Sequence, residues 1–275
     1  MDFNLLFIET KLMKFKVEQP ELVTVKHKDN LRIIKYKRKV FYDNLWTPNL
    51  QECRGIVVDE EDNIVSRPFT KIFNYQENNT TIPLTEKILW VKKYNGFMAA
   101  QTKDLVTTTG SFDSDFTKMA REFLHPTKMT GTLLFEICHP NDPHIIVEKP
   151  GAYLIGIRDL HTNKPYNTSL EKEDFLNDLA EFHGWLRPEY GSAVFGDLLD
   201  SLKTVKHEGF CVYGSTNLKV KSPYYLQSKA IARSNKQLSL DEEFTPLLAQ
   251  MPKNLTEQER LAFIRNYFTE NQTSF

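Results

Sequence analysis

Short runs of apolar residues separated by polar turns fill the chain between about residues 31 and 222. Runs of this length, rich in Val, Ile, Leu and Phe, predict β-strands. Tight polar turns at 60–62, 102–104 and 215–217 join neighbouring runs, so we expect much of the sheet to be antiparallel. The expected strands cover residues 31–36, 54–59, 63–69, 88–93, 96–101, 105–109, 132–139, 144–148, 153–159, 209–214 and 218–222.

Helices are expected around and after this strand-rich region. Apolar spacing indicates helices at 114–124 and 194–202, and an amphipathic helix over about 1–16. Capping boxes at 168–171, 239–242 and 256–259 open three more. The order predicts an α+β fold, with an antiparallel core, peripheral helices and a short helical segment after about residue 225.

Composition narrows the class of protein. The 275 residues are 40% hydrophobic, which is ordinary for a globular chain, and 35 basic against 36 acidic residues give a net charge of −1. An overall electrostatic attraction to nucleic acid is therefore excluded, and any polyanion site must be assembled by the fold. Three scattered cysteines and no apolar run of about 18 residues favour a reducing compartment, the cytoplasm, and no membrane span. They are Cys53, Cys138 and Cys211.

The segment Lys92-Lys93-Tyr94-Asn95-Gly96 lies between two expected strands. One interpretation is structural, because Asn-Gly is the commonest pair in a tight hairpin turn and the lysines would be solvated. The other makes Lys93 a nucleophile at a strand end, with Gly96 allowing close approach of a ligand. An amine attacks only when neutral, so this second interpretation needs cations or burial that lower the pKa of Lys93.

Candidate neighbours for Lys93 come from the last expected hairpin. Lys219 and Lys221 alternate on one strand, so their side chains share a face, although an exposed edge strand would look the same. The segment Glu208-Gly209-Phe210 leads into this hairpin and carries a carboxylate to the same end of the sheet.

Three further charged residues are candidates for a buried site. Glu136 interrupts a nearly continuous apolar strand, where a carboxylate is costly unless it is paired or turned outward. Arg54 and Lys71 bracket an expected hairpin and suit phosphate binding, although each alone is more often a surface charge.

In this fixed order the motifs resemble those of the covalent nucleotidyltransferases, which comprise DNA ligases, RNA ligases and mRNA-capping guanylyltransferases. The motifs are Lys93-x-Asn95-Gly96, Phe135-Glu136, Glu208-Gly209-Phe210 and Lys219-x-Lys221. Flanking segments at 52–56, 66–74 and 219–225 are similar to the phage-type RNA ligase 1 family. The resemblance implies an antiparallel-sheet nucleotidyltransferase (adenylyltransferase) domain of the ATP-grasp-like ligase type over 1–225, and a short helical C-terminal extension over 226–275.

The resemblance also implies a reaction. The family joins a 5′-phosphate to a 3′-hydroxyl of RNA with ATP and a divalent metal, Mg²⁺ or Mn²⁺. Lys93 would take AMP from ATP, the AMP would move to the RNA 5′-phosphate, and the 3′-hydroxyl would displace it. Lys219 and Lys221 would hold the α-phosphate and lower the pKa of Lys93 by like-charge repulsion.

The remaining matches imply nucleotide and metal contacts. Glu208 would hold the metal, directly or through water. Glu136 would accept a hydrogen bond from a ribose hydroxyl, and Arg54 and Lys71 would orient the pyrophosphate. The full set of implied nucleotide-binding residues is Tyr36, Arg54, Lys71, Gly96, Glu136, Lys219 and Lys221.

Three departures from the family pattern keep alternatives open. Asn95 stands where relatives usually have aspartate, and Thr109 stands where a basic residue is common. The C-terminal segment is short, and no acidic metal ligand can be matched in it, although acidic residues lie at 241–243. The leading hypothesis is an ATP-dependent RNA ligase acting on RNA ends, with no membrane and no obligate protein partner, in the host cytoplasm if phage-encoded. The alternatives are a DNA ligase or capping-type enzyme, which usually carries an OB-fold, and a catalytically weak module that binds nucleotide or RNA ends.

A basic and aromatic cluster near residue 36 has two interpretations as well. It could bind an RNA strand by phosphate contacts and stacking, or it could be an ordinary exposed strand with alternating charges. The cluster comprises Lys35, Tyr36, Lys37, Arg38, Lys39, Phe41 and Tyr42.

Overall fold

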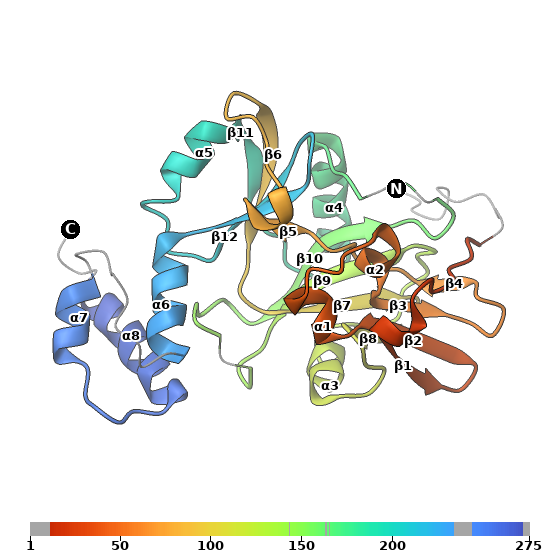
Figure 1. The fold of residues 1–275 in the computed structure, drawn as a ribbon, viewed down its shortest axis with the longest axis horizontal. Helices are drawn as coiled ribbons and strands as arrows, with labels where there is room; N and C mark the ends of the chain where they lie inside the picture. Colours follow the sequence, from red (N-terminus) through yellow and green to blue (C-terminus); the bar gives the residue numbers. More distant parts are fainter. Residues whose placement is uncertain (1–11, 143, 163, 165, 234–243, 272–275) are drawn as a thin grey trace.

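The computed structural model describes residues 12–142, 144–162, 164, 166–233 and 244–271 (Figure 1). Most of the expected N-terminal helix lies outside these residues, as do the capping box at 239–242 and the acidic residues 241–243. Residues 12–16, the described end of the expected N-terminal helix, are not helical, and Lys14 forms a β-bridge with Asn63.

Within the described residues the strands form three sheets, all antiparallel except for the short β13–β5 pairing. The first has the order β1 (Val23–Lys28), β2 (Leu31–Tyr36), β3 (Arg54–Val58), β4 (Ile64–Ser66). The second has the order β10 (Gly151–Arg158), β9 (Thr132–Cys138), β7 (Phe97–Thr102), β8 (Leu105–Thr108). The third has the order β11 (Tyr190–Val194), β6 (Lys87–Lys93), β12 (Gly209–Tyr213), β13 (Leu218–Lys221), β5 (Phe73–Asn74).

Helices lie around these sheets, and three of them gather at one side of the molecule (Figure 1). The expected helices appear as α3 (Asp115–Arg121), α4 (Leu170–His183), α5 (Phe195–Ser201) and α8 (Glu257–Asn271). The others are α1 (Arg38–Tyr42), α2 (Pro48–Glu52), α6 (Pro223–Arg233) and α7 (Thr245–Gln250), with 3₁₀ turns at Pro20–Leu22 and Glu77–Asn79. Among the described helices, none is long and apolar enough to span a bilayer.

Two of the predicted helix starts can be compared with the structure. The capping box before α8 is confirmed, because Thr256 and Glu259 exchange side-chain to backbone hydrogen bonds in both directions. The box at 168–171 is wrong by one residue. Ser169 is the N-cap of α4, and its hydroxyl accepts from the backbone N–H of Lys172.

Three differences concern the strands. The expected strand at 144–148 is instead an irregular loop, in which only Ile145 is buried. Strands β1, β5 and β11 were not expected, since β1 (VTVKHK) is mostly exposed and polar and β5 has two residues. Of the two interpretations of the segment 92–96, the tight hairpin turn across Asn95-Gly96 is wrong, because β6 and β7 belong to different sheets.

The second and third sheets face each other, and β9 lies buried between layers. Its Leu133, Phe135 and Ile137 pack toward α3 and α4, whereas Leu134 packs against Leu89 and Val91 of the third sheet. Because side chains alternate along a strand, Glu136 must point the same way as Leu134, into the space between the two sheets.

Candidate active site

A cavity of about 270 Å³ opens between the second and third sheets. Apolar side chains such as Phe69 and Ile155 form part of its wall, and charged ones meet across it. The charged groups come from strands of all three sheets: Arg54 from β3, Lys92 and Lys93 from β6, Glu136 from β9 and Lys219 from β13. Four residues predicted far apart in the sequence as site residues therefore line one cavity.

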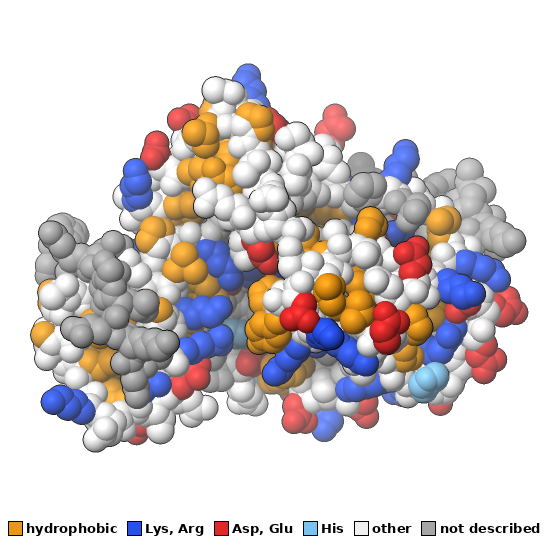
Figure 2. Space-filling view, in the orientation of Figure 1, with side chains coloured by type: hydrophobic (Ala, Val, Ile, Leu, Met, Phe, Trp, Pro, Cys, Tyr) orange, Lys and Arg blue, Asp and Glu red, His pale blue; other side chains and the backbone are white. Residues whose placement is uncertain are grey.

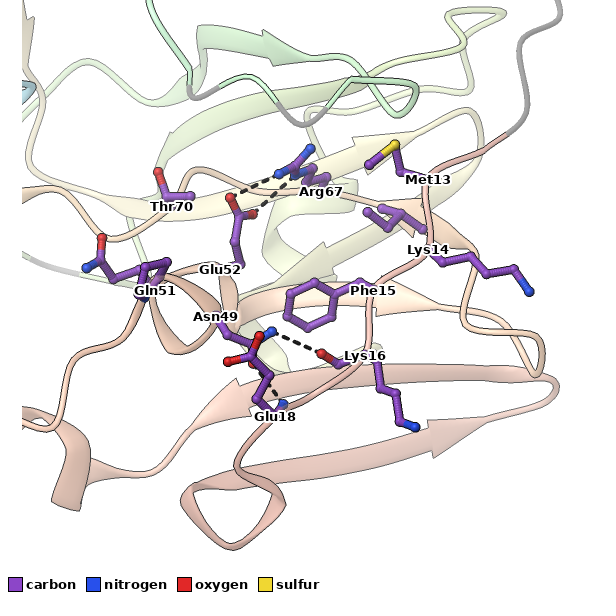
Figure 3. Close-up of a pocket in the computed structure, with 12 residues that line it drawn as sticks. Met13, Lys14, Phe15, Lys16, Glu18, Asn49, Gln51, Glu52, Arg67 and Thr70 are labelled. Carbon is purple, nitrogen blue, oxygen red and sulfur yellow. Dashed lines mark hydrogen bonds and ion pairs between the residues drawn. The ribbon is translucent and has the colours of Figure 1, made fainter.

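A larger cavity, of about 560 Å³, lies beside α2 and the chain before it (Figure 3). Two of its charged groups neutralise each other, since the Arg67 guanidinium forms a forked ion pair with Glu52 at 3.0 and 3.1 Å. Arg158 lies 3.6 Å from the same carboxylate. Glu52, part of a segment that resembles the ligases, is thus a structural ion-pair partner.

Lys93 ends β6 with its ammonium group between two carboxylates. Its Nζ lies 3.0 Å from Glu208 Oε2 and 3.7 Å from Glu136 Oε1. Burial by itself lowers the pKa of Lys93, but the two carboxylates outweigh it and the pKa is raised. The net lowering of this pKa that the resemblance implied is therefore not seen, because the two carboxylates outweigh the repulsion between Lys93 and Lys219.

Asn95 is a buried connector at the point where the chain crosses from the third sheet to the second. Its Nδ2 donates to Glu208 Oε2 at 2.8 Å, and its Oδ1 accepts from the backbone N–H of Ile146 at 3.0 Å. An aspartate here would set a second carboxylate against Glu208 without a hydrogen to donate. The amide therefore fits this site in a way that the charge usual in relatives would not.

Gly96 permits a close approach of two backbones. A Cβ at this position would come within 2.2 Å of the carbonyl oxygen of Ile137, on β9. The Gly96 N–H donates to Glu136 Oε1 at 3.1 Å. The close approach expected here is thus made by the second sheet, and a nucleotide contact of Gly96 stays a prediction.

Glu208 is nearly inaccessible and fully engaged. Besides Lys93 and Asn95 on Oε2, Lys221 lies 3.3 Å from Oε1. Burial alone would raise the pKa of Glu208, yet the ammonium groups of Lys93 and Lys221 lower it below its usual value. Glu208 is therefore a carboxylate that holds two lysines.

The strand β13 presents its two lysines on one face, as predicted. Leu218 and Val220 are buried on the other face, and β13 is not an edge strand, because it pairs with β12 and, over two residues, with β5. Burial, together with the charges of Arg54 and Lys93, lowers the pKa of Lys219 to about 7. This lysine, rather than Lys93, is the one whose ammonium form is destabilised.

Arg54 lines the cavity, with Tyr36 beside it. Lys71 does not line the cavity itself, but its charge lies close enough to act on Arg54 and Lys219. Burial lowers the pKa of Arg54, opposed by the neighbouring Tyr36 and Glu136, and its Nη1 donates to the Thr70 carbonyl oxygen at 3.3 Å. Lys71 pairs with Glu77 at 3.0 Å. Its Nζ also lies 4.7, 5.5 and 5.6 Å from the ring centroids of Phe73, Trp46 and Phe41.

Glu148 is an ionisable neighbour of the site that the sequence did not reveal. It follows the loop that bonds to Asn95, its Oε1 is buried without a hydrogen-bond partner, and burial raises its pKa. Because a strand was expected at 144–148, Glu148 was counted as part of that strand and not as a site residue. Only the observation that a carboxylate follows an apolar run near the second motif could have suggested it.

The described residues do not form a ready metal site. Within them no three His, Cys, Asp or Glu side chains are grouped to hold a cation. Both oxygens of Glu208 already face ammonium groups, which would repel a divalent ion. Direct metal coordination by Glu208 therefore does not fit the arrangement seen here.

Comparisons with known proteins show the family to which the chain belongs. A family model described as RNA ligase matches residues 52–225, more than half of the chain. The chain therefore belongs to this RNA ligase family, of the phage type, and is an RNA ligase enzyme that uses ATP. No curated protein sequence matches it.

Solved structures share the fold. Two archaeal ATP-dependent RNA ligase structures, form 1 and form 2, align with TM-scores of 0.55 and 0.54 at 15% and 16% identity. The alignments cover 88% and 86% of this chain and 73% and 71% of theirs. A protein described as an ATP-dependent DNA ligase from Aquifex aeolicus aligns with a TM-score of 0.54 at 12% identity, over 92% of this chain and 70% of that one.

Proposed function

We propose that this RNA ligase seals 5′-phosphate and 3′-hydroxyl RNA ends through an AMP adduct on Lys93. The observation that carries the proposal is the position of the Lys93 amine, at a cavity that also gathers Arg54, Glu136 and Lys219. In the first step its nitrogen would form a bond to the α-phosphorus of ATP, and the bond from that phosphorus to pyrophosphate would break. The adenylyl group would then pass to the RNA 5′-phosphate, and the RNA 3′-hydroxyl would displace AMP.

The neighbours of Lys93 have roles that follow from charge. Lys219 and Arg54 would stabilise the oxygens on which negative charge grows as the phosphorus is attacked. Glu136 and Gly96 would fix the nucleotide side of the cavity, with Tyr36 beside Arg54. Lys221 and Lys71 are paired with Glu208 and Glu77, respectively. They would contact the substrate only if its phosphates displaced these carboxylates.

Lys93 must lose a proton before it attacks, since the ammonium group has no lone pair. Glu208 Oε2 accepts a hydrogen bond from Lys93 Nζ, but the pKa of Glu208 is lowered and that of Lys93 is raised, so the proton would leave only after substrate has rearranged these ion pairs. Phosphate binding beside Lys219 would add negative charge and draw the cations of the site toward the substrate.

Magnesium or manganese belongs to the proposal as a partner of ATP rather than of a protein cage. Magnesium usually binds through substrate phosphates, keeps several waters, and needs only one or two protein carboxylates. Because the oxygens of Glu208 face lysines in this structure, no step is assigned to a metal held there.

The domain division is proposed near residue 225, with the catalytic part before it and a short helical extension after it. Tyr225 lies within α6 and belongs to the small core that α6 shares with α7 and α8. The boundary would therefore lie inside the first two turns of this helix. Cys53, Cys138 and Cys211 are all free thiols, which supports a reducing compartment such as the cytoplasm.

The adjacent lysines 92 and 93 supply a matched test. Incubation with α-labelled ATP and magnesium, followed by denaturing electrophoresis, should label the native chain and the Lys92→Ala variant but not Lys93→Ala. Lys92 pairs with Glu189 at 3.0 Å and should be dispensable for the adduct. Circular dichroism should show Lys93→Ala folded, because the side chain ends a strand beside a cavity.

Two results would reject this assignment. Label retained by folded Lys93→Ala would place the nucleophile elsewhere. No label on the native chain at any pH or divalent metal would favour the nucleotide-binding module over an active enzyme.

A further inference from the structure

The short helix α1 carries exposed rings and cations that the fold itself does not use. Val40 anchors the helix and is fully buried, whereas Phe41 is 50% and Tyr42 is 74% exposed. The two rings lie edge to face with centroids 5.6 Å apart. We call the surface formed by Lys37, Arg38, Lys39, Phe41 and Tyr42 the α1 patch.

Positive charge is concentrated in the α1 patch although the chain as a whole has a net charge of −1. Its three consecutive cations are exposed, and Asp43, the C-cap of the helix, is the acidic residue beside them. Lys37 Nζ donates to the backbone oxygen of Glu21 at 2.8 Å and not to a carboxylate there. Such a local excess attracts a polyanion.

The α1 patch is continuous with the cavity that holds Lys93. It directly follows Tyr36, the last residue of β2, which lies beside Arg54 of the cavity wall. The Phe41 ring also lies 5.6 Å from Lys71 Nζ. In Figures 1 and 2, α1 lies near the middle of this face of the molecule, where basic and apolar side chains lie side by side with acidic ones among them.

We propose that the α1 patch binds single-stranded RNA next to the end that reaches Lys93, with bases stacked on Phe41 and Tyr42 and phosphates held by Arg38 and Lys39. This inference rests on the proposed function. Exposed rings interleaved with cations are the chemistry that binds a single strand without reading its sequence, because every base has a face to stack. A protein partner would have no need for the run of cations beside the rings.

Fluorescence anisotropy with a short, 3′-labelled, 5′-phosphorylated single-stranded RNA, without ATP, tests the proposal. Tyr42→Ala should bind at least about fivefold more weakly, since loss of one stacked base has this effect or a larger one. Arg38→Ala with Lys39→Ala should also lower the slope of log affinity against log salt, by about 0.7 for each phosphate that the variant no longer neutralises. Both variants should form the lysyl-AMP adduct from ATP at the native rate.

Matched controls come from exposed residues of other elements. Phe182 of α4 is 70% exposed, and Lys203 after α5 forms a surface pair with Asp200. Phe182→Ala and Lys203→Ala should bind RNA as the native chain does. If Tyr42→Ala and the double variant also bind RNA natively while the native chain seals RNA, the α1 patch is rejected and the proposed function stands.

Other outcomes are equally decisive. A native chain that neither binds RNA nor forms an adduct would reject the proposed function itself. If the control variants bound RNA as weakly as the α1 patch variants do, the effect would come from surface substitution in general. This result would also reject the α1 patch as the RNA-binding surface.

Discussion

At the scale of single residues, this site is organised by what each charge faces. Lys93, Glu208 and Lys221 form one chain of ion pairs, with Asn95 supplying the amide that completes it. The consequence is that Lys93, the proposed nucleophile, is stored as an ammonium ion. Lys219 lies near these ion pairs but is not a member of them. Burial destabilises its ammonium group.

Binding of phosphate should therefore depend on the protonation of Lys219. Its pKa is lowered to about 7 without substrate, and a bound phosphate would raise it, so binding takes up a proton. Affinity should be full below pH 7 and should fall as pH rises above it, by up to about tenfold per unit. Isothermal titration with an ATP analogue that cannot be cleaved between its α- and β-phosphates measures this.

The control separates Lys219 from the titration of the nucleotide itself. Lys219→Arg keeps its charge throughout this range and should bind with a flatter pH dependence than the native chain. An identical pH dependence in both proteins would remove Lys219 from the explanation.

At the scale of elements, the decisive feature is the crossing from β6 to β7 between two sheets. The short segment 94–96 brings the end of β6, which carries Lys93, against the C-terminal end of β9 at Ile137. Glu136 reaches Lys93 and the Gly96 N–H through this contact. A tight hairpin at the same sequence would have kept both lysines on one two-stranded ribbon.

Gly96→Ala should disturb both stability and the first reaction step. The new methyl carbon would meet the Ile137 carbonyl oxygen at 2.2 Å, so the strands must separate. We expect a loss of about 1–3 kcal/mol in the free energy of unfolding, as for an overpacked core, and a lower rate of adduct formation. Urea denaturation and the labelling assay measure the two effects.

Gly184→Ala is the matched control. Gly184 caps α4 with φ +71° and has open space where the methyl group of an alanine would lie, so only backbone strain of about 1–2 kcal/mol is expected. Adduct formation should be unchanged in this variant. Equal losses of adduct formation in both variants would point to global stability rather than to the crossing.

At the scale of the whole molecule, a small separate core holds the C-terminal helices together. Phe244, Leu247, Leu261, Ile264 and Phe268 form it with residues of α6. Two links join this core to the active site. Ile145 packs into it next to the loop residue that bonds Asn95, and Tyr225 of α6 lies under Lys221 Nζ at 5.0 Å.

Phe244→Ala tests these links. Removal of a fully buried ring should destabilise the C-terminal core by about 3–5 kcal/mol. Hydrogen exchange should increase in α6–α8 before it does in the sheets, and adduct formation should fall because Asn95 and Lys221 lose support. Unchanged adduct formation despite rapid exchange in these helices would show that the tail does not support the first step.

Most strands followed from the sequence alone, and so did four of the residues that line the candidate cavity, Arg54, Lys93, Glu136 and Lys219. Alternation of apolar residues predicted the strands around Lys93, Glu136 and Lys219, because a strand buried on one or both faces has apolar residues at regular positions in the sequence. The spacing of the motifs also pointed to the right family. These features depend on neighbours in the chain, so they can be read without the fold.

Only the tertiary structure decided how the charges pair. Lys93 lies 115 residues from the carboxylate it contacts, so no local pattern could show that Glu136 and Glu208 would raise its pKa rather than Lys219 and Lys221 lower it. The same holds for Asn95, which read locally as a turn residue and proved to be a buried hydrogen-bonding centre. Electrostatic energy depends on distance through space and on burial, and both are set when the sheets pack.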